Sequence, residues 1–174
     1  MVENIFLGLG SNKGDRLDYI KRAVYRIQED KESRVEIISS VFESEPYGKK
    51  NQYCFLNAIV NLSSNRNSKS MYLWIKNLEK EIGRIPGEKW GSREIDIDLL
   101  FYNNLIYDDG SVVIPHKEIL LRDFVIVPMQ QVAPEFEHPV EKIKMKDIDL
   151  NKIEKLIFKE YKVDLSNSQG EKIG

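Results

Sequence analysis

Asp96 and Asp98, separated by one residue, are the side chains whose type and spacing most directly suggest chemistry. They lie in residues 89–102, KWGSREIDIDLLFY, which are rich in Ile, Leu and aromatic residues and therefore typical of a buried strand. Because side chains alternate across a strand, both carboxylates point to one face, about 6–7 Å apart. Mg²⁺ suits such a pair, since it is commonly held by one or two carboxylates together with substrate phosphates. The spacing indicates metal-assisted phosphoryl transfer, in which two ions about 4 Å apart hold the attacking and leaving oxygens.

An alternative is that Glu94, Asp96 and Asp98 form the solvated face of an antiparallel sheet. Aspartate is disfavoured in strands, however, and two on one face are less favourable still. The loops around the strand also carry cations: Arg84, Lys89, Arg93, Lys117 and Arg122. Each cation by itself is most simply a solvated surface charge, but their placement around one strand favours a site for a polyphosphate and its metal ions.

The elements that must position this strand follow from hydrophobic periodicity and turn residues. Strands are predicted over residues 4–10, 35–44, 54–64 and 93–102, and helices over residues 15–30 and 68–83. Asp15 is the expected N-cap of the first helix, and Gly83 is the expected end of the second. The order strand, helix, strand, strand, helix, strand predicts an α+β fold, a ferredoxin-like βαββαβ sandwich with helices over a mostly antiparallel sheet.

Alternation along the aspartate strand predicts two different faces. One face carries the apolar residues that would pack beneath the helices: Ile95, Ile97, Leu99 and Phe101. The other carries Glu94, Asp96, Asp98 and Leu100. The two carboxylates should therefore lie on the sheet face that does not form this core.

The C-terminal extension is less regular. Residues 111–135 combine a short strand, a Pro-His turn and a short helix, and residues 149–161 predict a third long helix. The apolar face of that helix would consist of Leu150, Ile153, Leu156 and Ile157. We expect a single domain over residues 1–162, followed by a polar, frayed tail over residues 163–174.

The composition limits the classes of protein to consider. The 174 residues are 41% apolar and 31% charged, which is ordinary for a globular domain and excludes a disordered chain. The formal net charge of −2 argues against a nucleic-acid partner, because such proteins usually carry a basic excess. No apolar run approaches the roughly 18 residues that span a bilayer, so we expect no membrane partner. The single cysteine, Cys54, excludes an internal disulfide and a thiolate-rich metal site, and with no signal-peptide pattern it favours the cytoplasm.

Residues 89–100, KWGSREIDIDLL, resemble the signature of the 6-hydroxymethyl-7,8-dihydropterin pyrophosphokinases, enzymes of the folate pathway. Other family-like stretches occur in the expected order: LGSNKGDR (9–16), SEPYG (44–48), FLNAIV (55–60) and IPHKEILLRDFVIVPMQQVAPE (114–135). The resemblance extends over about residues 3–140. The Arg-x-x-Asp-x-Asp motif is highly specific in this context, whereas an isolated Asp-x-Asp would be weak evidence.

The resemblance implies a reaction and its cofactor ions. The family transfers a pyrophosphoryl group from ATP to the hydroxymethyl oxygen of the reduced pterin and releases AMP. Two Mg²⁺ ions would be held by Asp96 and Asp98, and Arg84 and Arg93 would act on the triphosphate. The residues implied in ATP binding are Glu79, Lys89, Arg93, Leu99, His116, Lys117 and Arg122. For Glu79, an exposed carboxylate on the second helix is an equally simple interpretation.

The same resemblance implies a pterin pocket formed by Ser44, Glu45, Tyr47, Phe55, Asn57, Trp90 and Phe124. Phe55 and Phe124 would stack on the flat ring, and Asn57 can both donate to and accept from its amide-like edge. Without the resemblance, plain core packing would be the simpler interpretation of the two phenylalanines. The implied partners are the small molecules ATP and reduced pterin, bound by a monomer or weak homodimer.

Some positions depart from the family pattern. The loop over residues 84–91, RIPGEKWG, is one residue shorter than the commonest form. Ser111 stands where an arginine can contact ATP, Lys117 replaces a frequent tyrosine, and Tyr47 is bulkier than the usual leucine. These differences bear on loop dynamics and nucleotide affinity rather than on the reaction.

Two other functional classes share part of this pattern. A nucleotidyltransferase also pairs a Gly-Ser turn with an Asp-x-Asp strand, but there the turn lies shortly before the aspartates. Here Gly10 and Ser11 precede Asp96 by most of the domain. An RNA-binding module on the same sandwich would need exposed aromatic residues on the sheet and a basic face. Metal-dependent nucleotide binding distinguishes the enzyme from the RNA-binding module.

Overall fold

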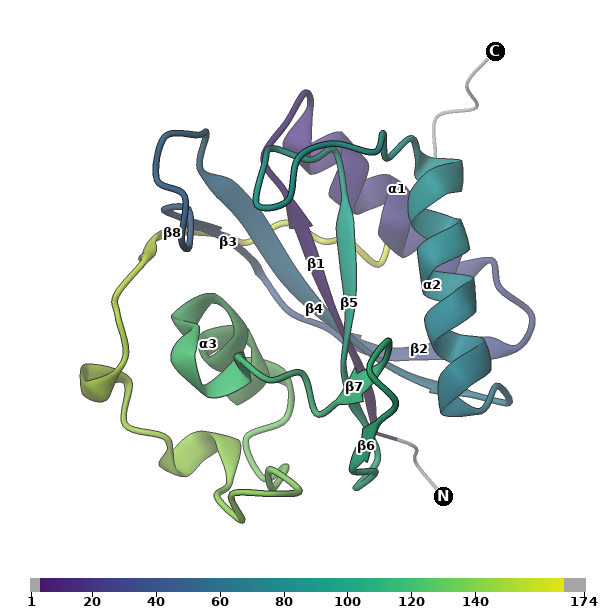
Figure 1. Cartoon of the computed structure of the whole chain (residues 1–174), viewed down its shortest axis with the longest axis vertical. Coiled ribbons are helices and arrows are strands. Elements are labelled where there is room, and N and C mark those ends of the chain that lie inside the picture. The colour runs from purple at the N-terminus through teal and green to yellow at the C-terminus, as the bar shows by residue number, and fades with distance from the viewer. Residues whose placement is uncertain (1–3, 168–174) are drawn as a thin grey trace.

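The computed structural model describes residues 4–167, which fold around a six-stranded sheet (Figure 1). The strands are β1 (Ile5–Ser11), β2 (Ser33–Ile38), β3 (Val41–Ser44), β4 (Phe55–Ser64), β5 (Asp96–Tyr102) and β8 (Ile157–Tyr161). They follow the order β5-β1-β4-β3-β8, and β2 also pairs with β4. Every strand pairing recorded among residues 4–167 is antiparallel, which confirms the predicted α+β sandwich.

Helices cover both faces of this sheet. The helices α1 (Arg16–Gln28) and α2 (Ser68–Ile82) lie against one face, and α3 (Asp123–Val132) lies against the other (Figure 1). The smaller elements are β6 (Tyr107–Asp108), β7 (Val113–Ile114) and the 3₁₀ helices Ile119–Leu121, Met145–Asp147 and Leu150–Lys152. Within the described part of the chain, no helix has the length and apolar character needed to cross a membrane.

Local sequence signals explain where α1 and α2 begin and end. The Asp15 carboxylate accepts the Asp18 N–H at 3.0 Å and caps α1, as predicted. Asn67 caps α2 in the same way, by accepting the Ser70 N–H at 2.9 Å. Gly83 ends α2 with φ of 117°, a left-handed conformation that glycine adopts without steric cost. Both predicted helices are therefore confirmed.

A β-bulge in β5 divides its apolar residues between the two sides of the sheet. Phe6 pairs with Phe101 and Leu7 pairs with Leu99, so Leu100 is the extra residue. Leu99 packs in the core under α1 and α2, whereas Leu100 and Phe101 both pack in the core under α3. The expectation that Phe101 shares a face with Leu99 is wrong, because the bulge reverses the alternation after Leu100.

The predicted third long helix over residues 149–161 is wrong. This segment contains the 3₁₀ helix Leu150–Lys152 and then β8, which pairs antiparallel with β3. Pairing satisfies the outer edge of β3, and this tertiary contact overrides the local helical pattern. The apolar residues still face inward, since Leu156 is buried and Leu150 and Ile153 pack on the core under α3.

The polar tail was expected to begin at residue 163. Instead, Val163 packs against the core under α1 and α2, and Leu165 is buried within it. Residues 168–174 lie outside the described residues, so for them a frayed tail stays a prediction. The assignment of residues 1–162 to a single domain likewise stays a prediction.

Candidate functional site

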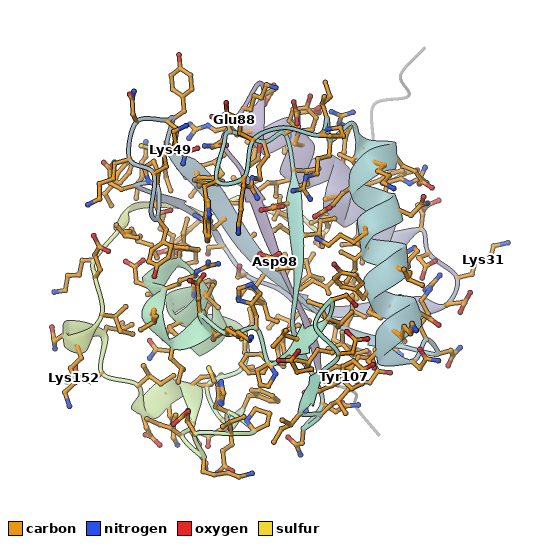
Figure 2. The ribbon with its side chains drawn as sticks, in the orientation of Figure 1. Lys31, Lys49, Glu88, Asp98, Tyr107 and Lys152 are labelled. Carbon is orange, nitrogen blue, oxygen red and sulfur yellow. The ribbon has the colours of Figure 1, made fainter. Side chains whose placement is uncertain are left out.

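A cavity of about 250 Å³, here called the central pocket, lies over β1, β4 and β5 beside the start of α3. It brings together residues that are far apart in the sequence. The predicted polar and charged residues that line it are Ser44, Glu45, Asn57, Arg93, Asp96, Asp98, His116 and Arg122. The predicted aromatic residues that line it are Tyr47, Phe55, Trp90 and Phe124. Figure 2 shows Asp98 on β5 near the middle of the molecule.

Glycines of β1 form the floor of the central pocket. Gly10 pairs with Asp96 on one side and with Asn57 on the other, and Gly8 pairs with Asp98 and Ile59. A Cβ atom at Gly10 would lie 3.7 Å from Phe55 Cδ1 and 3.9 Å from Asn57 Oδ1. Because these glycines have no side chains, no atom beyond the β1 backbone fills the bottom of the central pocket at these positions. Adjacent strands are about 4.8 Å apart, so Asp96 and Asn57 lie about 10 Å apart on either side of it.

The two aspartates have different partners. Asp96 Oδ1 lies 3.1 Å from the Arg84 guanidinium, and Asp96 Oδ2 accepts a hydrogen bond from Arg93 at 2.7 Å. The carboxylate of Asp98, in contrast, makes no hydrogen bond or ion pair with any residue of the described range 4–167. Burial raises the pKa of Asp98, and the neighbouring Asp96 charge raises it further. A cation between the two carboxylates would remove this penalty.

Glu79 on α2 is hydrogen-bonded to the backbone of β5 on the face of the sheet that α2 covers. Its side chain is 2% exposed, and it accepts the Ile97 N–H at 2.7 Å and the Lys76 ammonium at 3.0 Å. It also pairs with Arg84. Although burial lowers the pKa of Arg84, the charges of Asp96 and Glu79 outweigh it and raise that pKa. The alternative of an exposed Glu79 carboxylate is wrong, because this side chain is buried between two cations and the strand that carries the aspartates.

Asn12 holds the start of the aspartate strand. Its Oδ1 accepts the Arg93 N–H at 2.8 Å, and its own N–H donates to the Arg93 carbonyl at 3.1 Å. Its Nδ2 donates to Gln52 Oε1 at 3.0 Å and to the Tyr53 carbonyl at 3.1 Å. Asn12, which follows β1, is thus hydrogen-bonded both to the loop after β3 and to Arg93, the residue whose guanidinium binds the Asp96 carboxylate. Sequence reasoning missed Asn12 and Gln52, since only the long-range fold brings them to the site.

Two loops meet beside the central pocket. Lys49 Nζ lies 3.4 Å from Glu88 Oε2, and Gln52 Nε2 donates to the Trp90 carbonyl at 3.4 Å. Figure 2 shows Lys49 and Glu88 near each other at one end of the molecule. Trp90 has φ of 66° and its side chain is 46% exposed, so the ring is not fixed in the core. The pocket is therefore bordered by loops rather than closed by a rigid element.

The remaining predicted nucleotide residues lie in two adjoining hollows. Glu79, Arg84 and Lys89 line one hollow, which shares Trp90 and Arg93 with the central pocket. Leu99 and Lys117 line the other, which shares Asp98 and His116. Lys76 lines both hollows, and Glu118 lines the central pocket and the second hollow. Sequence reasoning missed Lys76, although its place one turn before Glu79 put it within reach of β5.

An aromatic wall stands opposite the aspartates. The rings of Tyr47 and Phe124 meet edge to face, with centroids 6.3 Å apart. The Arg122 guanidinium lies 5.0 Å from the centroid of Tyr47 and pairs with Glu118. Glu94, in contrast, does not line the pocket, because it is buried and bound to Lys13 at 2.7 Å. The expectation that it shares the face of the two aspartates is wrong, since β5 begins only at Asp96.

Asn57 offers its amide oxygen to the pocket. Its Nδ2 donates to the Phe42 carbonyl at 3.2 Å and to Ser44 Oγ at 2.9 Å. Its Oδ1 faces the space above Gly10. The side chain is buried, so these hydrogen bonds fix its orientation.

Comparison with known proteins decides the family. The family model of 7,8-dihydro-6-hydroxymethylpterin-pyrophosphokinase (HPPK) matches residues 6–134. This chain belongs to the HPPK family. It is accordingly an ATP-using pyrophosphokinase of folate synthesis with small-molecule substrates.

Several HPPK relatives are similar over most of the chain. The 2-amino-4-hydroxy-6-hydroxymethyldihydropteridine pyrophosphokinase of Aquifex aeolicus is 38% identical over 84% of this chain and 90% of its own length. The Bacillus subtilis enzyme of the same name is 30% identical over 76% of this chain and 79% of its own length. Folic acid synthesis protein FOL1 of Dictyostelium discoideum is 33% identical over 84% of this chain, which covers only 22% of that longer protein.

Solved structures of HPPK-DHPS proteins share the fold. The wild-type Plasmodium falciparum protein with pteroate aligns with a TM-score of 0.68 at 15% identity, over 86% of this chain and 42% of that one. An HPPK-DHPS in complex with substrates aligns with a TM-score of 0.69 at 14% identity, over 85% of this chain and 43% of that one. This chain therefore spans less than half of those longer proteins, and at such low identity the likeness shows the fold alone.

Asp96 and Asp98 are the two carboxylates that β5 contributes to the central pocket. Among the described residues, no group of three or more His, Cys, Asp or Glu side chains is placed to hold a metal ion. Mg²⁺ does not require such a cage when substrate phosphates complete its coordination. Asp96 and Asp98 fit that use, since they lie on one wall of a pocket whose glycine floor leaves room for a ligand.

Proposed function

We propose that this chain transfers the pyrophosphoryl group of ATP to the hydroxymethyl oxygen of 6-hydroxymethyl-7,8-dihydropterin, forming the pterin diphosphate and AMP. The observation that carries the proposal is the cross-strand row of Asp96, Gly10 and Asn57. It puts a carboxylate suited to a metal–polyphosphate and an amide suited to a pterin edge on opposite sides of one pocket floor. The family match over residues 6–134 supports the same reaction.

Two Mg²⁺ ions would be held by Asp96 and Asp98. The donors fit, because Asp98 has no cationic side chain bound to it within residues 4–167 and carries a pKa raised by burial and by Asp96. When bound, the ions would neutralise the triphosphate and lower the pKa of the substrate hydroxyl. The protein would then need to supply mainly positioning and charge.

Arg84 and Arg93 would exchange Asp96 for phosphate oxygens. Each guanidinium now holds one oxygen of Asp96, at 3.1 Å and 2.7 Å. Binding of the metal-bound nucleotide would release both arginines, and a guanidinium binds phosphate as readily as carboxylate. Glu79 would keep Arg84 close to the site, and so would serve the nucleotide through Arg84 rather than by touching it.

The adjoining hollows would hold the rest of ATP. Leu99, His116 and Lys117 line one of them, where the backbone of Leu99 would meet the adenine. Lys89 lies in the other, on the loop that borders the pocket. Arg122 stands between the hollows and the aromatic wall, where it would bind ATP after leaving Glu118.

The aromatic wall would hold the pterin. Phe55 rises beside Gly10, and Phe124 stands across the pocket beside Tyr47, so a flat ring would stack between the two phenylalanines. Asn57 would bind the ring edge, together with backbone groups of Ser44, Glu45 and Tyr47. Trp90 would close over the substrates from its loop. We propose that the active form is a monomer or weak homodimer in the cytoplasm.

The deciding experiment is to identify the nucleotide product. The protein is incubated with ATP, Mg²⁺ and 6-hydroxymethyl-7,8-dihydropterin, and nucleotides are separated by chromatography. AMP that depends on both the pterin and Mg²⁺ is the expected result. ADP as the product would contradict pyrophosphoryl transfer, and AMP formed without the pterin would contradict the acceptor.

A further inference from the structure

Leu156 and Ile157, in the C-terminal part of the chain, are hydrogen-bonded to Asp123 and Glu45, which lie at or next to the central pocket. The N–H groups of both residues donate to Asp123 Oδ2, each at 2.8 Å. The carbonyl of Leu156 accepts the Glu45 N–H at 3.0 Å. Leu156 and Asp123 are both buried, so the hydrogen bond between them is shielded from water. The junction lies beyond residues 6–134, the part of the chain that the family model matches.

Asp123 lies between two residues of the pocket without lining the pocket itself. It is the first residue of α3 and is 5% exposed. Its neighbours in the chain, Arg122 and Phe124, both face the pocket. A shift of the Asp123 backbone would therefore move both of them. Charge-assisted hydrogen bonds to backbone N–H groups are stronger than neutral ones, so Asp123 is well suited to fix this position.

Only one of the two carboxylate oxygens of Asp123, Oδ2, accepts hydrogen bonds from Leu156 and Ile157. Asp123 Oδ1 is buried and has no hydrogen-bond partner among the described residues. A negative charge at the first turn of α3 interacts favourably with the helix dipole. The side chain thus depends on Leu156 and Ile157 for its hydrogen bonds.

The loop that carries Tyr47 is bound to the same junction through Glu45, whose N–H donates to the Leu156 carbonyl. Glu45 opens this loop, and the ring of Tyr47 meets Phe124 with centroids 6.3 Å apart. Lys50, later in that loop, lies 3.4 Å from Glu154, which adds an exposed contact to the same segment. Both aromatic partners are therefore anchored, through Asp123 and Glu45, to one short stretch of backbone.

We infer that Asp123 is a positioning residue for the pterin, and that the segment over residues 154–157 sets the distance between Phe124 and the Tyr47 loop. The inference rests on the proposed function, since it takes the aromatic wall as the place where the pterin binds. Its consequence is that pterin affinity depends on a C-terminal contact that the family match does not include.

The test compares Asp123→Asn and Asp123→Ala with the wild-type chain. Asn keeps one oxygen to accept the two N–H groups but loses the charge, whereas Ala removes the acceptor. We expect the KM for the pterin to rise about threefold for Asn and about tenfold for Ala, with kcat changed less than about twofold, because charged hydrogen bonds are about twice as strong as neutral ones. Amide exchange at residues 44–48 should quicken in the same order.

Asp149→Ala is the matched control. Asp149 is an exposed aspartate shortly before the segment over residues 154–157; it accepts the Asn151 N–H at 3.0 Å and does not line the central pocket. It should leave the pterin KM unchanged. If Asp123→Ala does not fold, Asp123→Asn decides.

A lowered melting temperature with an unchanged pterin KM would make Asp123 merely structural and overturn the inference. Failure of the proposed function looks different. In that case the wild-type chain itself would form no pterin-dependent AMP.

Discussion

Asp96 of β5 lies directly opposite Gly10 of β1 in the antiparallel register of the two strands. On its other side Gly10 pairs with Asn57 of β4. Gly10, which has no side chain, therefore lies between the Asp96 carboxylate and the Asn57 amide. A strand residue with a Cβ atom here would project into the central pocket, towards Phe55. The glycine is therefore explained by the space that a ligand needs rather than by backbone conformation.

Gly10→Val is expected to block the floor while the sheet still forms. Valine favours strands, and a Cβ atom at this position would make ordinary contacts, the nearest at 3.7 Å. The added methyl groups would occupy the space between Asp96 and Asn57, so pterin binding should fall by at least about tenfold, and Gly10→Ala should have a smaller effect. Titration of both variants with the pterin, followed by tryptophan fluorescence, measures this. Normal affinity in Gly10→Val would show that the ring does not lie over β1.

Asp98→Asn should separate activity from stability. The neutral side chain removes a metal ligand, so AMP formation should fall by about 10²-fold or more, as for other groups that stabilise charge in the transition state. The same change removes a partly buried charge whose pKa is raised by desolvation and by Asp96, so the melting temperature without ligands should stay the same or rise. Asp147→Asn, at an exposed aspartate remote from the pocket, is the control and should change neither property. A near-normal rate in Asp98→Asn would refute the metal assignment.

Glu79→Gln should weaken both the fold and the site. The buried carboxylate compensates Lys76 and Arg84 and accepts the Ile97 N–H. Loss of its charge leaves the partly buried Lys76 without its carboxylate partner and leaves Arg84 with Asp96 alone, so the free energy of unfolding should fall by about 2–3 kcal/mol. Urea denaturation measures the loss. Glu81→Gln on the same helix, where the exposed Glu81 pairs with Arg26, should cost much less. Equal effects of the two changes would contradict a bracing role for Glu79.

The parts of the fold with local signals were predictable from the sequence. Asp15 and Gly83 mark helix ends through side-chain capping and a left-handed turn, which depend on near neighbours only. The aspartate pair was recognisable because carboxylates are unusual in an apolar strand. A signal for the burial of Glu79 also existed, since it lies on the same stripe of α2 as Ile75 and Ile82.

The features that the sequence did not reveal depend on contacts between distant residues. The bulge at Leu100 has no signature, because Leu100 and Phe101 are both apolar and either could face either core. The spacing of Leu150, Ile153 and Ile157 suits a helix as well as the extended path that pairs with β3. Only the Asp123 carboxylate and the free edge of β3, both remote in sequence, favour the second.

His138, which does not line the central pocket, gives the fold a pH dependence. It is buried, its ring packs on Phe101 with centroids 5.5 Å apart, and its Nδ1 accepts the N–H groups of Val140 and Glu141, each at 3.2 Å. These two hydrogen bonds require an unprotonated Nδ1. Burial lowers the pKa of His138 below the ordinary value of 6.5, although the Glu141 charge acts in the opposite direction.

The direction of the effect on stability follows from proton binding. Below about pH 6.5 the unfolded chain takes up a proton at His138 before the folded chain does, so the free energy of unfolding should fall as the pH is lowered. Above pH 6.5 both states are neutral at this site, and the contribution is fully present. Urea denaturation at pH 7.5, 6.5 and 5.5 should therefore show a larger loss of stability in the lower interval than in the upper one. His138→Gln should reduce that loss, even if it lowers stability at every pH, because it removes the titrating group. An unchanged pH slope in His138→Gln, or a ring resonance that titrates above pH 6.5 in the wild-type protein, would show that burial does not control this histidine.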